Sequence, residues 1–459
     1  MITSPIFTTN LTAEEITPAA ARNYIDKHYR YELPRLVKLD EYYSGHHQIC
    51  GRTKEGALSN NKVMTNHAAY IAKFTAAYLI GAPVTYSAKD GADIAPLTDY
   101  LALADSPTQD ADLALDAAVF GRAYELMYMS ADETPVPKLA RLSPLNAFVV
   151  YDDTVEQNPV FGVYYYPVYE PGNSSPKYFK CALLTAEYSQ EFVTSSGFSV
   201  TAQNEPVPHF FGAVPLDEIF NDGQRQGDFE QVISLIDAYN TLQSDRVNDK
   251  EQFVDALLLI KGQILGDNND EKTETYNAMK QNRVLELSSD SDASFLTRQF
   301  DESSIEVLRK SIVSDIHKIS GVPDMSDESF AGNSSGVAMK YKLLNLEQIT
   351  KTKERYFAEG LRYRLKCFAN VLTAKGGGLI DVSAINIGFT RSLPANELEL
   401  SQVVNNLTGK VPQATLLSLL PFVADPEAAA KELADEKQES LNRQQMMFSN
   451  TPLVNGNEE

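Results

Sequence analysis

The sequence predicts a multidomain α+β protein, and three observations support this prediction. Between residues 123 and 211, Tyr, Val and Phe alternate with polar residues between clusters of Pro, Gly, Asn and Ser, which is the pattern of short antiparallel strands. Two amphipathic segments, 228–252 and 302–320, repeat apolar residues at helical spacing. Residues 337–375 contain no proline, and a continuous helix over this range would be about 58 Å long.

Length and composition narrow the class of protein. A chain of 459 residues can form several domains, and its formal net charge of -22 argues against a general nucleic-acid-binding surface. Cys50, Cys181 and Cys367 lie far apart, so the sequence predicts neither a disulfide framework nor a zinc cluster, and a reducing intracellular origin is expected. No stretch approaches 18 apolar residues and no signal-peptide pattern is visible, so no membrane span is expected.

The first 120 residues are predicted to be mainly helical. Thr17 is expected to cap a helical stretch that reaches residue 45, because Pro18 suits the first helical position. Pro34 is expected to kink or divide this stretch. A Gly-Ala-Pro sequence at residues 81–83 should end the next helix. The expected order is helix 17–45, helix 68–79, strand 84–86 and helix 110–120.

The middle of the chain reads as two helices with a small insertion between them. Asp228 is expected to cap the first helix at its amino end. The apolar run 256–260 and the segment 283–287 are each expected to form a strand. Residues 254–300 would then be a small α/β insertion between helices 228–252 and 302–320.

The carboxyl-terminal third begins with the long helix. Three glycines at 376–378 should end it. A strand is expected at 385–389, followed by two or three acidic helices from residue 396 to about residue 445. The tail beyond residue 447 is expected to be disordered.

A polar loop at residues 320–336 precedes the long helix, and its length is typical of functional loops on a rigid scaffold. Residues 332–336 fit the G-x-S-x-G pattern of a hydrolase nucleophile. That reading lacks a preceding strand, and no histidine follows His317. The same residues lack the GK[ST] ending of a phosphate-binding P-loop.

No other catalytic constellation is visible. The six histidines show no metal-ligand spacing, and the pair His46–His47 is expected in a turn or at the surface. The adjacent carboxylates Asp152 and Asp153 would point apart in a strand, so they are expected in a turn. No catalytic, metal-binding or cofactor-binding residue is assigned, no cofactor is expected, and no enzymatic activity is predicted.

Seven sequence pieces, in order, resemble the portal (head–tail connector) proteins of long-tailed bacteriophages, the type common in siphophages of Gram-positive hosts. The resemblance covers roughly residues 20–440. Each piece is weak alone, but their order and spacing agree with the family. They are residues 42–49, residue 66 with 78–84, 120–125, 149–153, 237–245, 320–342 and 387–394.

The resemblance implies a multidomain portal fold that assembles into a ring of about twelve copies around an axial tunnel. It places the parts of the chain as follows: 1–222 the α+β wing, 223–253 the first stem helix, 254–300 the clip, 301–320 the second stem helix, 321–335 the tunnel loop, 336–378 the long wing and tunnel helix, 379–447 the crown, and 448–459 the tail.

The resemblance also implies a function and a set of partners. The ring would occupy one vertex of the capsid in the virion, after synthesis in the host cytoplasm. It would nucleate head assembly with the major capsid and scaffolding proteins and dock the large subunit of the terminase motor. It would also pass double-stranded DNA during packaging and ejection, and later bind a head-completion or adaptor protein. No membrane partner is expected.

The tunnel loop and the helix after it supply the candidate site residues. In a ring, the loop carboxylates would form an acidic collar that repels phosphates, which suits a conduit. The loop residues of interest are Val322, Asp324, Met325, Asp327, Glu328, Phe330 and Asn333. The basic residues of interest on the following helix are Lys340, Lys342, Lys351 and Arg355.

Two hypotheses explain the basic residues of the long helix. Residues 336–366 hold eight Lys and Arg against three Glu, in a chain that is acidic overall. Some could face the tunnel and contact phosphate. The favoured hypothesis is pairing with acidic residues of a neighbouring subunit, because Lys340, Glu347, Lys351 and Glu354 alternate in sign near one stripe.

The sequence leaves two other classes of protein open. A nuclease or other DNA-acting enzyme of the head-morphogenesis module would need a set of carboxylates arranged for metal binding, and the sequence offers no convincing one. A monomeric binding module is the other alternative, and a large native ring would exclude it.

Overall fold

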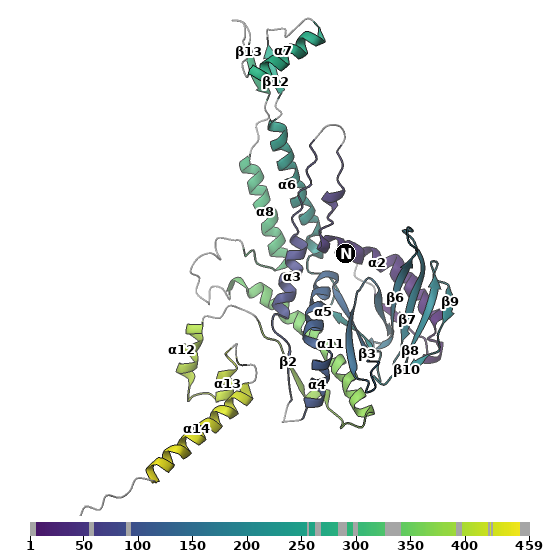
Figure 1. Cartoon of the computed structure of the whole chain (residues 1–459), viewed down its shortest axis with the longest axis vertical. Helices are drawn as coiled ribbons and strands as arrows, with labels where there is room; N and C mark the ends of the chain where they lie inside the picture. Colours follow the sequence, from purple (N-terminus) through teal and green to yellow (C-terminus); the bar gives the residue numbers. More distant parts are fainter. Residues whose placement is uncertain are drawn as a thin grey trace, which may run out of the picture. The chain divides into compact units, whose positions relative to one another are not determined.

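The computed structural model describes residues 6–54, 59–88, 93–254, 257–261, 268–282, 292–296, 302–325, 341–391, 397–420, 423 and 426–449. The chain forms two compact units. The first unit contains Met1–Ser326 and Leu343–Arg391, and the second contains Asp327–Lys342 and Ser392–Glu459. The first unit holds the strands in the range predicted for the wing and the two helices in the ranges predicted for the stem (Figure 1).

Helices dominate the start of the first unit, as predicted. The Thr17 side chain accepts a hydrogen bond from the Ala20 amide and Pro18 opens the first helix, so the predicted cap is confirmed. A π-helical turn at His28–Glu32 divides the stretch just before Pro34. The helices are α1 (Pro18–Lys27), α2 (Leu33–Ser44), α3 (His67–Leu79), α4 (Ala95–Leu103) and α5 (Ser106–Phe120), and the sequence analysis missed α4.

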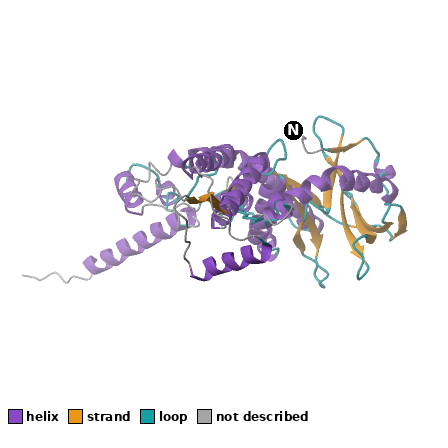
Figure 2. Cartoon of the chain, turned by 90° about the horizontal axis from the view of Figure 1, so that it is seen from above, coloured by secondary structure: helices purple, strands orange, loops and turns teal. Residues whose placement is uncertain are grey.

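The predicted strands form two sheets at one end of the first unit (Figure 2). The larger sheet has the order β1-β5-β6-β7-β8-β10, with β9 paired to β8; β1 runs parallel to β5 and the other pairs are antiparallel. Its strands are β1 (Phe7–Thr9), β5 (Ala147–Asp152), β6 (Pro159–Tyr169), β7 (Pro176–Leu184), β8 (Tyr188–Ser195), β9 (Val200–Gln203) and β10 (Val207–Pro208). Alternate aromatic residues of these strands, such as Phe148, Phe161 and Phe179, form its buried core.

A smaller antiparallel sheet contacts both the larger sheet and the helices. Its order is β11-β3-β4, from β3 (Arg122–Met129), β4 (Pro137–Leu142) and β11 (Leu216–Phe220). The polar strand β11 packs against both α5 and the long helix described below. This sheet therefore carries charged side chains into the interior, which is the basis of the ion pairs described below.

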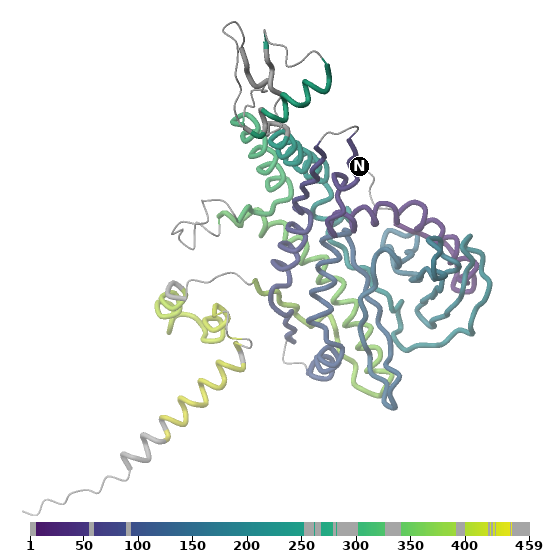
Figure 3. The backbone as a smooth tube through the Cα atoms, turned by 45° about the horizontal axis from the view of Figure 1, so that its top comes forward, coloured from purple at the N-terminus to yellow at the C-terminus, as the bar shows by residue number. Residues whose placement is uncertain are grey.

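Two long helices lie in the ranges predicted for the stem and run side by side (Figure 3). They are α6 (Ile233–Val254) and α8 (Glu302–Ser320). Arg246 of α6 pairs with Glu302 and Glu306 of α8. The prediction that Asp228 caps α6 is wrong, because the helix begins at Ile233 after a short 3-10 turn and Asp228 instead pairs with a buried lysine.

Between α6 and α8 the chain forms a small insertion, as predicted. It contains β12 (Leu257–Lys261), α7 (Asn269–Asn282) and β13 (Asp292–Leu296), and β12 pairs antiparallel with β13. The predicted strand at 283–287 lies outside the described residues.

The long helix is α11 (Leu344–Ala374), of 31 residues. Gly376 has a φ of 86° and follows its carboxyl end, which confirms the glycine stop. The predicted strand at 385–389 is β14 (Ile385–Gly388), which pairs antiparallel with β2 (Thr85–Ala88). The structure therefore joins the end of the unit to its beginning.

The second unit holds three helices in its described part, as predicted. They are α12 (Glu397–Leu407), α13 (Gln413–Leu417) and α14 (Pro426–Ser449), and α13 packs against α14.

Candidate functional site

The first residues of the predicted tunnel loop are held by three helices. Gly321 has a φ of 73°, and a Cβ on it would overlap the Ile349 side chain of α11. Val322 is buried, and its carbonyl oxygen lies 3.0 Å from His317 Nδ1 of α8. The Tyr70 hydroxyl of α3 donates to the Pro323 carbonyl oxygen at 3.1 Å. The loop therefore leaves the stem from a fixed base.

Only residues 321–325 of the predicted loop lie in the described part of the chain. Val322 packs inward, whereas the Met325 side chain is exposed. Asp324 Oδ2 lies 3.9 Å from His317 Nε2, so this carboxylate has a neighbour within its own chain. Asp327, Glu328, Phe330 and Asn333 lie outside the described residues, as does Lys340.

Two histidines, His67 and His317, lie next to the first residues of the predicted loop. His67 and His317 have ring centroids 6.2 Å apart, and His67 also packs edge-on against Tyr239 of α6. His67 Nε2 has no hydrogen-bond partner among the described residues. Burial, together with the nearby His317, lowers the pKa of His67 to about 4. His67 is therefore neutral in the folded chain at neutral pH.

This geometry predicts a pH dependence of stability. The unfolded chain binds a proton at His67 near its ordinary pKa of about 6.5, while the folded chain resists that proton until about pH 4. The free energy of unfolding should therefore fall as pH drops from about 6.5 toward 4. In chemical denaturation at several pH values, His67→Gln should flatten this slope.

The control for this prediction is His46→Gln, because His46 is exposed. It should leave the slope unchanged. A His67→Gln profile parallel to that of the parent chain would contradict the prediction.

The structure divides the basic residues of α11 into two groups. Lys353 and Arg364 are buried and paired within the chain, so neither hypothesis from the sequence applies to them. Lys351 and Arg355 are exposed one turn apart, and Lys351 Nζ lies 3.8 Å from Glu347. Lys342, at the start of the helical segment, is half-buried.

Arg364 forms the most deeply buried ion-pair cluster of the described residues. Its Nε and Nη2 atoms donate to Glu125 of β3, at 2.6 and 2.8 Å, and Nη2 also donates to Asp110 of α5 at 2.6 Å. Burial opposes its charge, but Glu125 and Asp110 outweigh burial and raise the pKa of Arg364 well above its ordinary value. This cluster ties the long helix to β3 and α5.

A second buried pair ties the long helix to the entry of the stem. Lys353 pairs with Asp228, which also accepts a hydrogen bond from Thr75 of α3. The Asp228 amide donates to the Ala118 carbonyl oxygen at 2.8 Å. Asp228 thus joins three helices instead of capping one.

Sequence reasoning also missed Arg391. Its guanidinium lies 3.2 Å from Glu347 and 2.7 Å from Glu354, and it packs over the Tyr78 ring. These two glutamates belong to the stripe predicted to pair between subunits, and the structure pairs them within the chain. No local signal could identify this contact, because Arg391 lies far along the sequence.

Two further predictions concern absences. In the described part of the chain, no three His, Cys, Asp or Glu side chains are grouped so that they could hold a metal ion. Among the same residues, no helix combines the length and the apolar character that a membrane crossing requires.

The expectation that His47 lies in a turn or at the surface is wrong. His47 is buried, and its ring contacts the Tyr42 carbonyl oxygen and the Asn240 side chain.

Together these features define a mixed α+β protein with two sheets packed on helices, two long paired helices and a loop base held by α3, α8 and α11. The chain belongs to the phage portal protein family of the SPP1 Gp6-like type, whose model matches residues 22–443. The predicted resemblance is thereby confirmed, and with it the function of a bacteriophage portal protein. Proteins of this family are structural components of the virion.

Individual relatives agree with the family match. The portal protein of Bacillus phage SPP1 is 24% identical over 377 residues, which cover 78% of this chain and 73% of that protein. The portal protein of Clostridium phage phiCD119 is 25% identical over 240 residues, which cover 50% of each chain. The chain thus spans about half the length of this second relative.

Solved structures with a similar chain come from gene transfer agent (GTA) particles. A chain in the neck of an empty GTA particle has a TM-score of 0.46 and 13% identity, covering 77% of this chain and 89% of that one. A chain in the virion of a native gene transfer agent particle has a TM-score of 0.47 and 13% identity, covering 84% and 92%.

Proposed function

We propose that about twelve copies of this chain form a ring at one vertex of a phage capsid and that double-stranded DNA passes through its axis. The ring nucleates head assembly with the major capsid and scaffolding proteins, docks the large terminase subunit during packaging and later binds a head-completion or adaptor protein. The chain contributes geometry and charge and performs no catalysis of its own. The family match over residues 22–443 is the observation that carries this proposal.

The proposal assigns a role to each part of the chain. The two sheets with α1–α5 are the wing, α6 and α8 are the stem, and the insertion with α7, β12 and β13 is the clip that meets the motor. Residues 321–335 are the tunnel loop, α11 links the tunnel to the wing, and α12–α14 form the crown. The fixed base at Gly321–Pro323 supports this assignment, because a loop that contacts moving DNA needs a rigid origin.

The native mass of the purified protein tests the proposal. About twelve copies of a 50.8 kDa chain give about 610 kDa, and end views in electron micrographs should show an axial hole. Mass photometry of the same sample gives the number of copies. A monomer at every salt concentration would exclude the ring and the tunnel with it.

The exposed cations of α11 are proposed to pair with acidic residues of a neighbouring subunit. Replacing Lys351 and Arg355 together by glutamate should weaken ring assembly, because two favourable charges become unfavourable, while the fold is kept. The ring fraction in mass photometry at low and high salt measures this effect, which should shrink as salt screens the charges.

Lys431→Glu is the matched control, because it reverses an exposed charge on α14 of the second unit. Rings of normal stability that package less DNA would instead support phosphate contact by Lys351 and Arg355, and would overturn the pairing hypothesis.

A further inference from the structure

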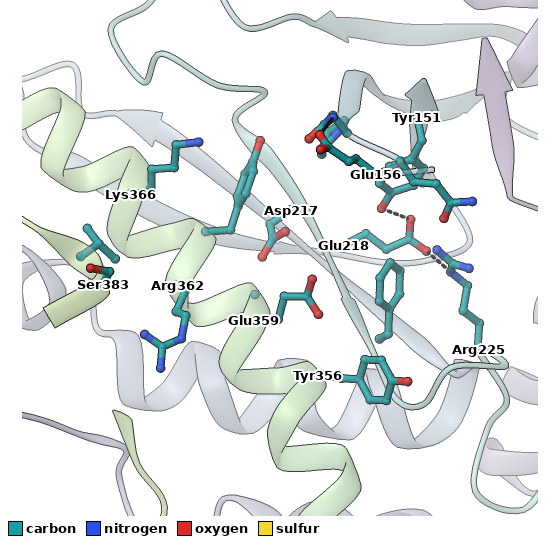
Figure 4. A pocket seen from close by; sticks show the side chains of 17 residues that line it. Tyr151, Glu156, Asp217, Glu218, Arg225, Tyr356, Glu359, Arg362, Lys366 and Ser383 are labelled. Carbon is teal, nitrogen blue, oxygen red and sulfur yellow. Dashed lines mark hydrogen bonds and ion pairs between the residues drawn. The ribbon is translucent and has the colours of Figure 1, made fainter. Parts of the chain in front are cut away.

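A pocket of about 690 Å³ opens on the first unit beside the long helix (Figure 4). Its walls come from β11, from α11, from the turn at residues 156–159 and from residues 382–383. Of the predicted loop residues that the structure describes, Val322, Asp324 and Met325 do not line it.

The floor of this pocket is a buried carboxylate. Asp217 of β11 lines the pocket and is 92% buried, since only 8% of its surface is exposed. Its Oδ2 atom has no hydrogen-bond partner among the described residues. Burial raises the pKa of Asp217 well above its usual range. A buried carboxyl group of this kind is costly unless something pairs with it.

The long helix passes close to this carboxylate at a glycine. Gly360 of α11 also lines the pocket, and a Cβ on it would lie 2.9 Å from Asp217 Oδ2 and 2.6 Å from the Ile219 side chain. Any other residue at this position would cover the carboxylate. The absence of a side chain at Gly360 therefore lets the pocket extend to Asp217, which is one of its lining residues.

The cations already in the pocket are engaged elsewhere. Arg225 lies 3.4 Å from Glu218 and packs over the Phe220 ring. Arg362 donates to the Ile385 carbonyl oxygen at 3.2 Å. The Tyr151 hydroxyl donates to Glu218 at 2.8 Å, so Glu218 interacts with both Tyr151 and Arg225.

At the rim, Glu359 and Lys366 are both exposed. Glu156 also lines the pocket and is exposed. With Asp217, three carboxyl groups then accompany one cation that is not engaged elsewhere, so the pocket can accept further positive charge. The chemical group that fits is an ammonium or guanidinium on a stem long enough to reach the floor.

We infer that the pocket receives a lysine or arginine side chain of a neighbouring copy of this chain, whose cationic head pairs with Asp217. This inference rests on the proposed ring. A ring has head-to-tail interfaces, so each copy presents the pocket once and supplies the inserted side chain once. A single ion is a poor occupant, because a cavity of about 690 Å³ far exceeds the roughly 30 Å³ that one water molecule occupies.

Asp217→Asn tests the inference, because it keeps the shape and removes the charge. Rings of this variant should dissociate at protein concentrations more than tenfold higher than rings of the parent chain, since losing one member of a buried charge pair at an interface is costly. Mass photometry over a dilution series measures this. Glu359→Gln at the rim should act in the same direction with a smaller effect, and Asp132→Asn, in an exposed turn, is the control that should change nothing.

The isolated chain supplies the second readout. Without a neighbour, Asp217→Asn should leave the denaturation midpoint unchanged or raise it, because it removes a buried carboxyl group whose Oδ2 atom has no hydrogen-bond partner among the described residues. A lower midpoint would mean that the isolated chain already provides a partner for Asp217, such as an internal water, and would overturn the inference.

The remaining outcomes separate this inference from the proposed function. Parent rings that form while Asp217→Asn rings are equally stable would refute the pocket and leave the ring intact. A parent chain that forms no ring would refute both. Spermidine or Mg²⁺ could also stabilise the isolated parent chain and fail to stabilise Asp217→Asn. That result would make a free cation the occupant and would refute the neighbouring copy.

Discussion

Replacing Arg364 with methionine is expected to lower the free energy of unfolding by about 3–5 kcal/mol, because it leaves two buried carboxylates without their cation. The Arg364 and Glu125 side chains are fully buried, and Asp110 is almost so. Burial already raises the pKa of Glu125, so this carboxylate depends on the guanidinium to stay ionised. Urea denaturation followed by circular dichroism measures the loss.

Two further variants make the test specific. Arg364→Lys should rescue only part of the loss, because one ammonium cannot reproduce the three hydrogen bonds that the guanidinium donates to two carboxylates. Arg355→Gln, on the exposed face of the same helix, should change stability by less than about 0.5 kcal/mol. An Arg364→Met chain as stable as Arg355→Gln would show that the buried cluster contributes nothing.

Gly121→Ala is expected to cost more than about 4 kcal/mol and to leave little soluble protein, because two penalties combine. Gly121 ends α5 with a φ of 84°, a conformation that costs roughly 1–2 kcal/mol for other residues. A Cβ there would also overlap the carbonyl oxygen of Arg225 and lie 2.7 Å from the carbonyl carbon of Gln226. These are backbone atoms of the segment that leads into the stem, so they cannot move aside cheaply.

Gly172→Ala is the matched control, because Gly172 has a nearly identical φ of 85° and a Cβ added there would meet no atom within 4 Å. It should cost only the conformational term, roughly 1–2 kcal/mol. Equal losses at the two positions, measured by thermal denaturation, would show that the contact between α5 and residues 225–226 is unimportant.

The spacing of apolar residues and the positions of Gly, Pro and capping residues were enough to predict most of the helices and strands. The bounds of α8 agree with the predicted helix, and Thr17 and the glycines after α11 mark helix ends by local chemistry that is readable in the sequence. The failures have a different cause. Asp228 has the right residue type for a helix cap, but tertiary pairing with Lys353 offers it a stronger partner than an amide of α6.

The site was harder to predict than the fold, because burial decides the role of a charge and burial is a tertiary property. Lys353 and Lys351 look equivalent in the sequence, yet one is buried in a pair and the other is mostly exposed. Asp217 gave no signal at all, because it lies in a short strand whose neighbours in space come from the distant helix α11. The resemblance to a family identified the function, and the structure was needed to sort the residues.

The two buried pairs of α11 have a mechanical consequence. Lys353 and Arg364 are 11 residues apart, which is about 17 Å and close to three full turns, so both point from nearly the same side of the helix. A helix held by two ion pairs along one side can neither rotate about its axis nor tilt without breaking one of these pairs. A force on the amino end of α11 would therefore bend the first turns of the helix, before Lys353. The rest of the helix would move little and would transmit the force to β3 and α5 through Arg364.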